Sequence, residues 1–164
     1  MAPIKRPLRI SVAGSGSASP EEIALAQQVG RLIAERGAVL ICGGLGGVME
    51  AACRGASEAG GMTIGLLPGR DPGAANPHVT VPIPTGIGEA RNALVAKASE
   101  ALIAVGGKLG TLSEIALALR AGIPVVALHS WEIDEERAQP FILHKAETPA
   151  EAVRLAFNLI KVRA

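Results

Sequence analysis

The sequence has very few aromatic residues and almost no net charge. Its only aromatic residues are Trp131, Phe141 and Phe157 among 164 residues, and the formal net charge is +1. Proteins that hold single-stranded nucleic acid usually combine aromatic stacking platforms with a positively charged groove. The composition therefore argues against nucleic acid as a partner.

Cysteine is also scarce, and long apolar runs are missing. Cys42 and Cys53 lie among small and apolar residues, and no group of Cys and His has the spacing of a zinc site. We expect two buried, reduced thiols and no metal. No run approaches the roughly 20 apolar residues of a membrane helix, and only a short apolar segment follows the basic N-terminus. We therefore expect a cytoplasmic protein with no signal peptide and no membrane partner.

Apolar residues and glycine, in contrast, are abundant. The chain is 49% hydrophobic and contains 20 glycines. Buried parallel strands are rich in apolar residues, and the tight turns between strands and helices need glycine. The length suits one domain, residues 1–164, of the α/β class.

Short apolar runs alternate along the chain with helical patterns. The runs predict strands at residues 8–14, 38–44, 62–69, 79–84, 101–106, 123–129 and 141–146. The patterns predict helices at residues 19–37, 47–61, 86–99, 111–122 and 148–161. Helical crossovers between buried strands predict one doubly wound, mostly parallel sheet of about six or seven strands flanked by helices, a Rossmann-like fold.

Three glycine-rich turns follow predicted strands: "AGSGSASP", "CGGLGGVME" and "VGGKLGTLSE". Ligands of such sheets lie beyond the carboxyl ends of the strands, and a helix N-terminus offers free N–H groups to an anion. Glycine is also what tight turns require, so each turn alone is weak evidence. Together they predict a site for a phosphorylated ligand. The candidate binding residues in the turns are Gly14, Ser15, Gly16, Gly43, Gly44, Gly46, Gly47, Met49, Gly106, Gly107, Lys108, Gly110, Thr111 and Glu114.

Glu114 has two interpretations. Thr111 and Glu114 have the spacing of a capping box, in which each side chain bonds the backbone N–H of the other residue. The same pattern occurs at Ser19–Glu22 and at Thr148–Glu151. The other two patterns have Pro in the first turn and no Gly pair before them, whereas the pattern at Thr111 follows "GGKLG" directly after an apolar strand, which favours a ligand role. The two roles are compatible.

Arg91 and Asn92 are further candidates, near the start of a predicted helix. An Arg there can form two parallel hydrogen bonds with a phosphate or carboxylate. The alternative is a solvated Arg91 paired with Glu89 or another acid. Lys108 likewise either meets an anion or is simply exposed.

The motifs resemble those of the LOG-like Rossmann superfamily, whose members were once widely labelled lysine decarboxylases. "VGGKLGTLSE" resembles the family's Gly-Gly-x-Gly-Thr-x-x-Glu signature, and "ICGGLGGVME" its Gly-Gly-rich turn followed by Val-Met. "TGIGEARNALVAKA" corresponds to its Arg-bearing helix. The resemblance covers residues 8–126 and, more weakly, the rest. Nothing marks a Lys that would bind pyridoxal phosphate, so decarboxylation has no support.

The resemblance implies two alternative functions. One branch hydrolyses nucleoside 5′-monophosphates to base and ribose 5-phosphate; its catalytic residues would be Arg91 and Glu114, and its phosphate-binding pair Gly110 and Thr111. That branch has Pro-Gly-Gly and Arg-Lys, where this chain has Gly106-Gly107-Lys108 and Arg91-Asn92.

At these positions the chain instead resembles the molybdenum cofactor carrier-like branch, which is related to the DNA-processing protein A family. It implies binding of molybdenum cofactor or another nucleotide-like phosphate without turnover, although Lys108 stands where that branch commonly has Gly. Relatives commonly dimerise through helices, so we also expect a homodimer or a higher homo-oligomer.

Overall fold

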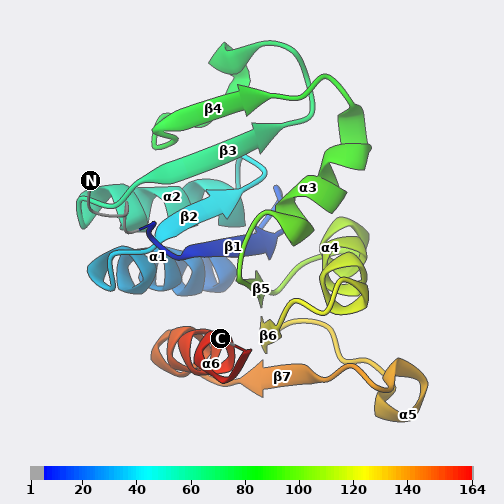
Figure 1. Ribbon diagram of the computed structural model, residues 1–164. Helices are drawn as coiled ribbons and strands as arrows, with labels where there is room; N and C mark the ends of the chain where they lie inside the picture. The colour runs from blue at the N-terminus through cyan, green and yellow to red at the C-terminus, as the bar shows by residue number, and fades with distance from the viewer. Residues whose placement is uncertain (1–5, 164) are drawn as a thin grey trace, which may run out of the picture.

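The computed structural model describes residues 6–163, which form one seven-stranded parallel sheet with helices on both faces (Figure 1). Residues 1–5 and 164, part of the predicted domain and N-terminal segment, lie outside the described residues. The strands are β1 Arg9–Gly14, β2 Val39–Cys42, β3 Thr63–Leu67, β4 Val81–Pro84, β5 Ala101–Val105, β6 Val125–Leu128 and β7 Leu143–Ala146. The α-helices are α1 Pro20–Glu35, α2 Val48–Glu58, α3 Asn92–Lys97, α4 Leu109–Arg120, α5 Glu135–Ala138 and α6 Pro149–Arg163, and the 3-10 helices η1 Pro72–Ala74 and η2 Gly88–Arg91.

The strand order is β4-β3-β2-β1-β5-β6-β7, and neighbouring strands pair in parallel. The sheet is strongly twisted, so that β1–β4 point to the right in Figure 1, β5 and β6 are seen end-on and β7 points to the left. The predicted doubly wound sheet is thus confirmed. Its strand order reverses between β1 and β5, which is where such sheets place their ligands.

Alternate residues of the central strands fill two separate cores. Ile10 and Val12 of β1 pack with α1, α2 and α6. Ala13 packs on the opposite face with α4, and Ser11 donates its hydroxyl to the Val95 carbonyl of α3 at 2.6 Å. Both faces of β1 are therefore buried, which explains the continuous apolar runs in the sequence.

Several element boundaries differ from the predicted ones. In place of the helix predicted at residues 86–99, the structure has η2 followed by the short α3. Gly86 and Gly88 have positive φ angles of 68° and 60°, which a right-handed α-helix does not accommodate, so the regular helix starts later than predicted. Helix α4 begins at Leu109, two residues before the predicted start. Strand β4 lies at the edge of the sheet, as its prolines predict.

The two thiols are buried in the larger core and are free. Cys42 ends β2, Cys53 lies in α2, and their Sγ atoms are 3.4 Å apart. Within residues 6–163 no helix is long and apolar enough to cross a membrane. The same residues include no group of three or more Cys, His, Asp or Glu placed to hold a metal ion.

Helices α1 and α2 approach each other closely through two glycines. A Cβ atom on Gly30 would lie 1.9 Å from the Ala52 carbonyl oxygen, and one on Gly55 would lie 1.9 Å from that of Gln27. Both distances are far inside van der Waals contact with rigid backbone. The glycines therefore set the spacing of the two helices, despite their cost to each helix.

Replacing Gly30 by Ala is expected to lower the free energy of unfolding by about 2 kcal/mol, the scale of overpacking. Ala would stabilise an isolated helix by about 1 kcal/mol, so the loss would reflect the helix contact alone. Urea-induced unfolding followed by circular dichroism measures it. Gly69→Ala is the control, since a Cβ there meets nothing within 4 Å; equal stability of the two variants would contradict the close-contact argument.

Candidate functional site

A cavity of about 410 Å³ lies where the strand order reverses, at the carboxyl ends of β1 and β2 and beside α3 and α4. In Figure 1 the arrowheads of β1 and β2 point toward the side on which these two helices lie. Its walls come from the three predicted Gly-rich turns and from the segment around Arg91. Eleven of the sixteen candidate residues line it: Gly14, Ser15, Gly16, Gly43, Met49, Arg91, Asn92, Lys108, Gly110, Thr111 and Glu114.

The other five candidates, all glycines, do not line the cavity: Gly44, Gly46, Gly47, Gly106 and Gly107. Four of them have positive φ angles: 75° at Gly44, 64° at Gly47, 52° at Gly106 and 104° at Gly107. A Cβ on Gly47 would also lie 2.2 Å from the Ser15 carbonyl oxygen. These four glycines are explained by turn geometry and by the close approach of neighbouring turns, whereas a Cβ on Gly46 would meet only ordinary contacts, the closest at 3.7 Å from the Gly16 carbonyl oxygen.

Arg91, at the end of η2, is buried with only 8% of its surface exposed. Its Nε has no hydrogen-bond partner among the described residues. The guanidinium lies directly over Gly43, where a Cβ would come within 1.7 Å of Nη1. Burial lowers the pKa of Arg91, while the charges of Glu114 and Cys42 act in the opposite direction. A buried guanidinium with an unused donor beside a cavity is the arrangement expected of an anion-binding group.

Glu114 lies in the second turn of α4, 7% exposed. Its carboxylate makes no hydrogen bond or ion pair of standard length within residues 6–163. Burial raises its pKa to about 7, and the positive charge of Arg91 partly opposes that rise. An ionisable group held near neutrality in a cavity is characteristic of binding and catalytic sites.

The capping-box interpretation of Glu114 is wrong. The helix begins at Leu109, its N-cap residue is Lys108, and no side chain caps it. Thr111 is therefore the third helical residue and cannot act as the cap. The pattern misled because its spacing can occur inside a helix, and only the backbone conformation of the preceding turn sets where the helix starts.

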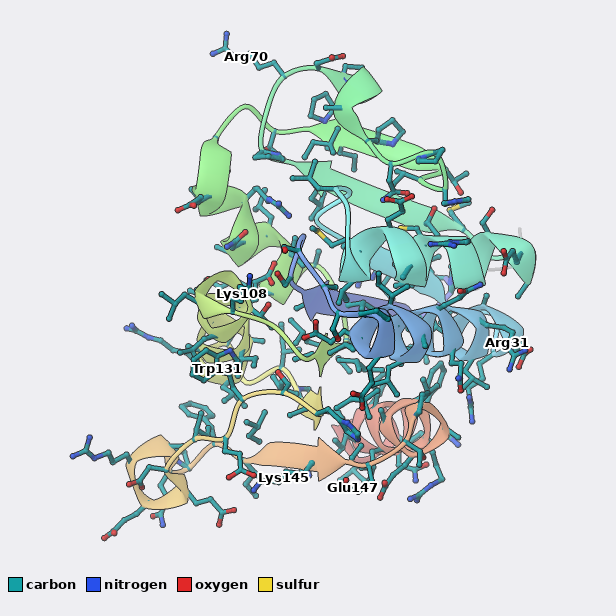
Figure 2. All side chains as sticks on the ribbon, turned by 180° about the vertical axis from the view of Figure 1, so that it is seen from behind. Arg31, Arg70, Lys108, Trp131, Lys145 and Glu147 are labelled. Carbon is teal, nitrogen blue, oxygen red and sulfur yellow. The ribbon has the colours of Figure 1, made fainter. Side chains whose placement is uncertain are left out.

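The start of α4 is held by contacts from α3 and from the segment after β6. The Trp131 indole Nε1 donates to the Lys108 carbonyl oxygen at 3.1 Å, and Figure 2 shows these two residues close together beside α4. Asn92 Nδ2 donates to Ser113 Oγ at 3.3 Å, and that hydroxyl donates to the Gly110 carbonyl oxygen at 2.7 Å. Asn92 thereby links α3 to α4.

Five lining residues are not among the candidates: Val12, Ala13, Leu45, Pro68 and Glu89. Val12 and Ala13 are apolar strand residues that no pattern distinguishes from the rest of the core. Glu89 was the alternative partner of Arg91, but the described residues contain no ion pair between them. It is an exposed carboxylate at the rim instead. Its position next to the Arg-bearing helix start is the signal that could have indicated it.

The cavity thus combines three chemical features. Arg91 and Lys108 supply positive charge. The first turn of α4 presents N–H groups with no side-chain cap, at the positive end of the helix dipole. Glu114 supplies a carboxyl group that changes charge near neutral pH. A small molecule that carries both an anionic group and polar N–H or O–H groups matches this combination.

Known proteins share this fold and sequence over nearly their full lengths. A sequence profile of the SLOG cluster4 family matches residues 7–154. An uncharacterised protein of Archaeoglobus fulgidus is 44% identical over 151 residues, which cover 92% of this chain and 95% of that one.

Two solved structures are similarly close. The molybdenum cofactor binding protein of Rippkaea orientalis is 38% identical, has a TM-score of 0.86, and is matched over 94% of this chain and 98% of that one. The molybdenum cofactor carrier protein of Chlamydomonas reinhardtii is 38% identical, has a TM-score of 0.87, and is matched over 95% and 99%.

DNA processing protein A of Streptococcus pneumoniae is 18% identical with a TM-score of 0.70, over 90% of this chain and 61% of that one, which shows a shared fold alone. These findings confirm the resemblance to the LOG-like Rossmann superfamily. By the extent of the profile match and the identity to its relatives, the chain belongs to the SLOG cluster4 family.

Proposed function

We propose that this protein binds a phosphorylated, nucleotide-like small molecule in the cavity between β1 and α4, and that it carries or stores molybdenum cofactor. The observation that carries the proposal is Arg91, buried beside the cavity with an unused Nε donor. A volume of about 410 Å³ lies within the usual range of small-molecule sites, about 300–1,000 Å³. The cofactor-binding relatives from Rippkaea and Chlamydomonas support the choice of ligand.

The residues fit the chemistry of that cofactor, a pterin that carries a phosphate group. Arg91, Lys108 and the N–H groups at Gly110 and Thr111 would hold the phosphate. The carboxyl groups of the cavity would accept hydrogen bonds from the amino and ring N–H groups of the pterin. When bound, the molybdenum supplies redox chemistry to the enzymes that use it, and none of the residues named here takes part in that chemistry.

Hydrolysis of nucleoside 5′-monophosphates is the second candidate function, and the raised pKa of Glu114 favours it. A carboxyl with a pKa of about 7 can accept or donate a proton at neutral pH, as a general acid or base must. A nearby carboxylate would also stabilise the positive charge that develops on the ribose. Against turnover stand Asn92 and Lys108, at positions where the hydrolases have Lys and Gly.

The two functions are separated by incubating the purified protein with AMP, CMP and GMP and measuring ribose 5-phosphate. A carrier is expected to release none. It should instead retain a pterin on purification, detectable by its fluorescence after oxidation. Release of ribose 5-phosphate that disappears in Glu114→Gln would establish the hydrolase in its place.

Arg91→Ala is expected to weaken binding of the phosphorylated ligand by about 10- to 100-fold, the loss of charge-assisted hydrogen bonds worth about 1.5–3 kcal/mol. Equilibrium dialysis with AMP and with the pterin phosphate measures the affinity. Arg70→Ala is the control, because Arg70 is exposed and Figure 2 shows it far from Lys108. Equal losses in both variants would mean that only the overall charge matters.

Glu114 should make the protein less stable as the pH rises. The folded pKa of about 7 lies above the ordinary value of 4.5, so the unfolded chain ionises first and stability is lost between these two values. The full difference is about 3 kcal/mol. Glu114→Gln should lack this loss and should exceed the natural protein in unfolding free energy at pH 8 but not at pH 4.5.

Urea-induced unfolding at a series of pH values between 4.5 and 8 measures this difference. Glu89→Gln removes an exposed carboxylate from the rim of the same cavity and should retain the decline seen in the natural protein. Parallel curves for the natural protein and Glu114→Gln would rule out the raised pKa.

A further inference from the structure

Glu22 connects two of the three Gly-rich turns. It lies in the first turn of α1, where its Oε2 accepts the backbone N–H of Ser19 at 2.7 Å and its own N–H donates to Ser19 Oγ at 3.1 Å. This is the capping box that the sequence predicts. The other carboxylate oxygen, Oε1, accepts the N–H of Gly107 at 3.1 Å. The Glu22 side chain thus accepts hydrogen bonds from both the end of the β1–α1 loop and the β5–α4 turn.

The Gly-Gly turn is shaped around this carboxylate. A Cβ on Gly106 would lie 1.8 Å from Glu22 Oε1, so only glycine leaves room for it. The hydrogen bonds from Ser19, joined by the one from Gly107 and the charge of Lys108, lower the pKa of Glu22. The carboxylate is therefore ionised at neutral pH, and its negative charge lies against the N–H groups of the turn.

Two further residues hold the turn from another element. Ser130 donates its hydroxyl to the Gly106 carbonyl oxygen, and Trp131 donates to that of Lys108. Both follow β6, whereas Glu22 belongs to α1. Neither Glu22 nor Ser130 nor Trp131 lines the cavity. The turn is consequently fixed from outside, and it carries Lys108 and the start of α4 into the cavity wall.

We infer that Glu22 is a positioning residue of the ligand site, and that its carboxylate occupies the anion position of the Gly106-Gly107 turn so that a ligand phosphate binds at Gly110 and Thr111 instead. This inference rests on the proposed function. Two negative groups cannot share the Gly107 N–H, because that donor forms one strong hydrogen bond and like charges repel. The N–H groups in the first turn of α4 have no side-chain cap, and Gly110 and Thr111 in that turn line the cavity.

The chain offers a matched control for the capping role of Glu22. In α6 the N–H of Glu151 donates to Thr148 Oγ1 at 3.2 Å, and Glu151 Oε2 accepts the N–H of Glu147 at 2.9 Å. Glu151 therefore stabilises a helix start by the same kind of contacts, but its carboxylate bonds no Gly-rich turn. Any effect that the substitutions of Glu22 and Glu151 have in common is therefore attributed to the loss of helix capping.

The test compares Glu22→Gln with Glu151→Gln. A Gln at position 22 keeps the size of the side chain but has only one acceptor oxygen for two N–H groups. Glu22→Gln should bind AMP on the order of tenfold more weakly, the scale at which outer-shell hydrogen-bond partners act, while Glu151→Gln should bind it as the natural protein does. Unchanged or tighter AMP binding by Glu22→Gln would overturn the positioning role.

Amide resonances locate the phosphate directly. Adding AMP to the natural protein should shift the amide signals of Gly110 and Thr111 more than that of Gly107. A dominant shift at Gly107 would show that the ligand, rather than Glu22, takes that donor, and would overturn the inference.

A measurement on the ligand-free protein separates failure of this inference from failure of the proposed function. The Gly107 amide should exchange slowly in the natural protein and in Glu151→Gln, and faster in Glu22→Gln. The fluorescence of Trp131, the single tryptophan of the chain, should change only in Glu22→Gln, since its indole bonds the same turn. If neither AMP nor a pterin phosphate binds, the proposed function fails. Equal exchange rates of the Gly107 amide in all three proteins would show that Glu22 does not hold the Gly107 N–H, and would overturn the inference.

Discussion

The whole site depends on the burial of one guanidinium. Arg91 lies over Gly43 with its Nε unsatisfied, and Glu114, the carboxyl group whose charge most opposes the lowering of the Arg91 pKa, has its own pKa raised by burial. Burying charge without a hydrogen-bonded partner costs several kcal/mol. The two apolar cores on either side of β1 and β5 offset that cost, since they keep the strand ends, and with them the cavity walls, in place. An anionic ligand would supply the hydrogen-bond acceptor that Arg91 Nε lacks among the described residues.

Much of this architecture is readable from local patterns. Short apolar runs bounded by turn residues predicted the seven strands, and these runs are continuous in the central strands because strands buried on both faces need continuous apolar sequence. The rule that ligands lie beyond the carboxyl ends of the strands directed attention to the three Gly-rich turns, and most of the candidate residues in them line the cavity. The short helix α5 was not predicted, since four residues give no periodic pattern to detect.

Local sequence patterns cannot identify a hydrogen-bond partner that lies far away in the sequence. Glu22 and Gly107 are separated by 85 positions, so the second contact of the capping carboxylate was invisible. For the same reason Thr111 was a plausible cap: its spacing to Glu114 is correct, but the preceding turn is held by Trp131, twenty-three positions from Lys108, and the helix starts earlier. Five of the candidate glycines in these turns do not line the cavity, and four of these have the positive φ angles that the turns themselves require.

The reversal of strand order between β1 and β5 has a thermodynamic consequence. One side of the cavity is built from residues 12–49 and most of the other from residues 89–114, so the two walls belong to different halves of the chain. A molecule that touches both walls binds only when both halves are folded, and its binding free energy adds to that of unfolding the sheet as a unit. Ligand binding in the cavity and the cooperativity of unfolding are therefore linked. A protein with ligand bound would release the ligand and lose its β1–β5 pairing in the same unfolding transition.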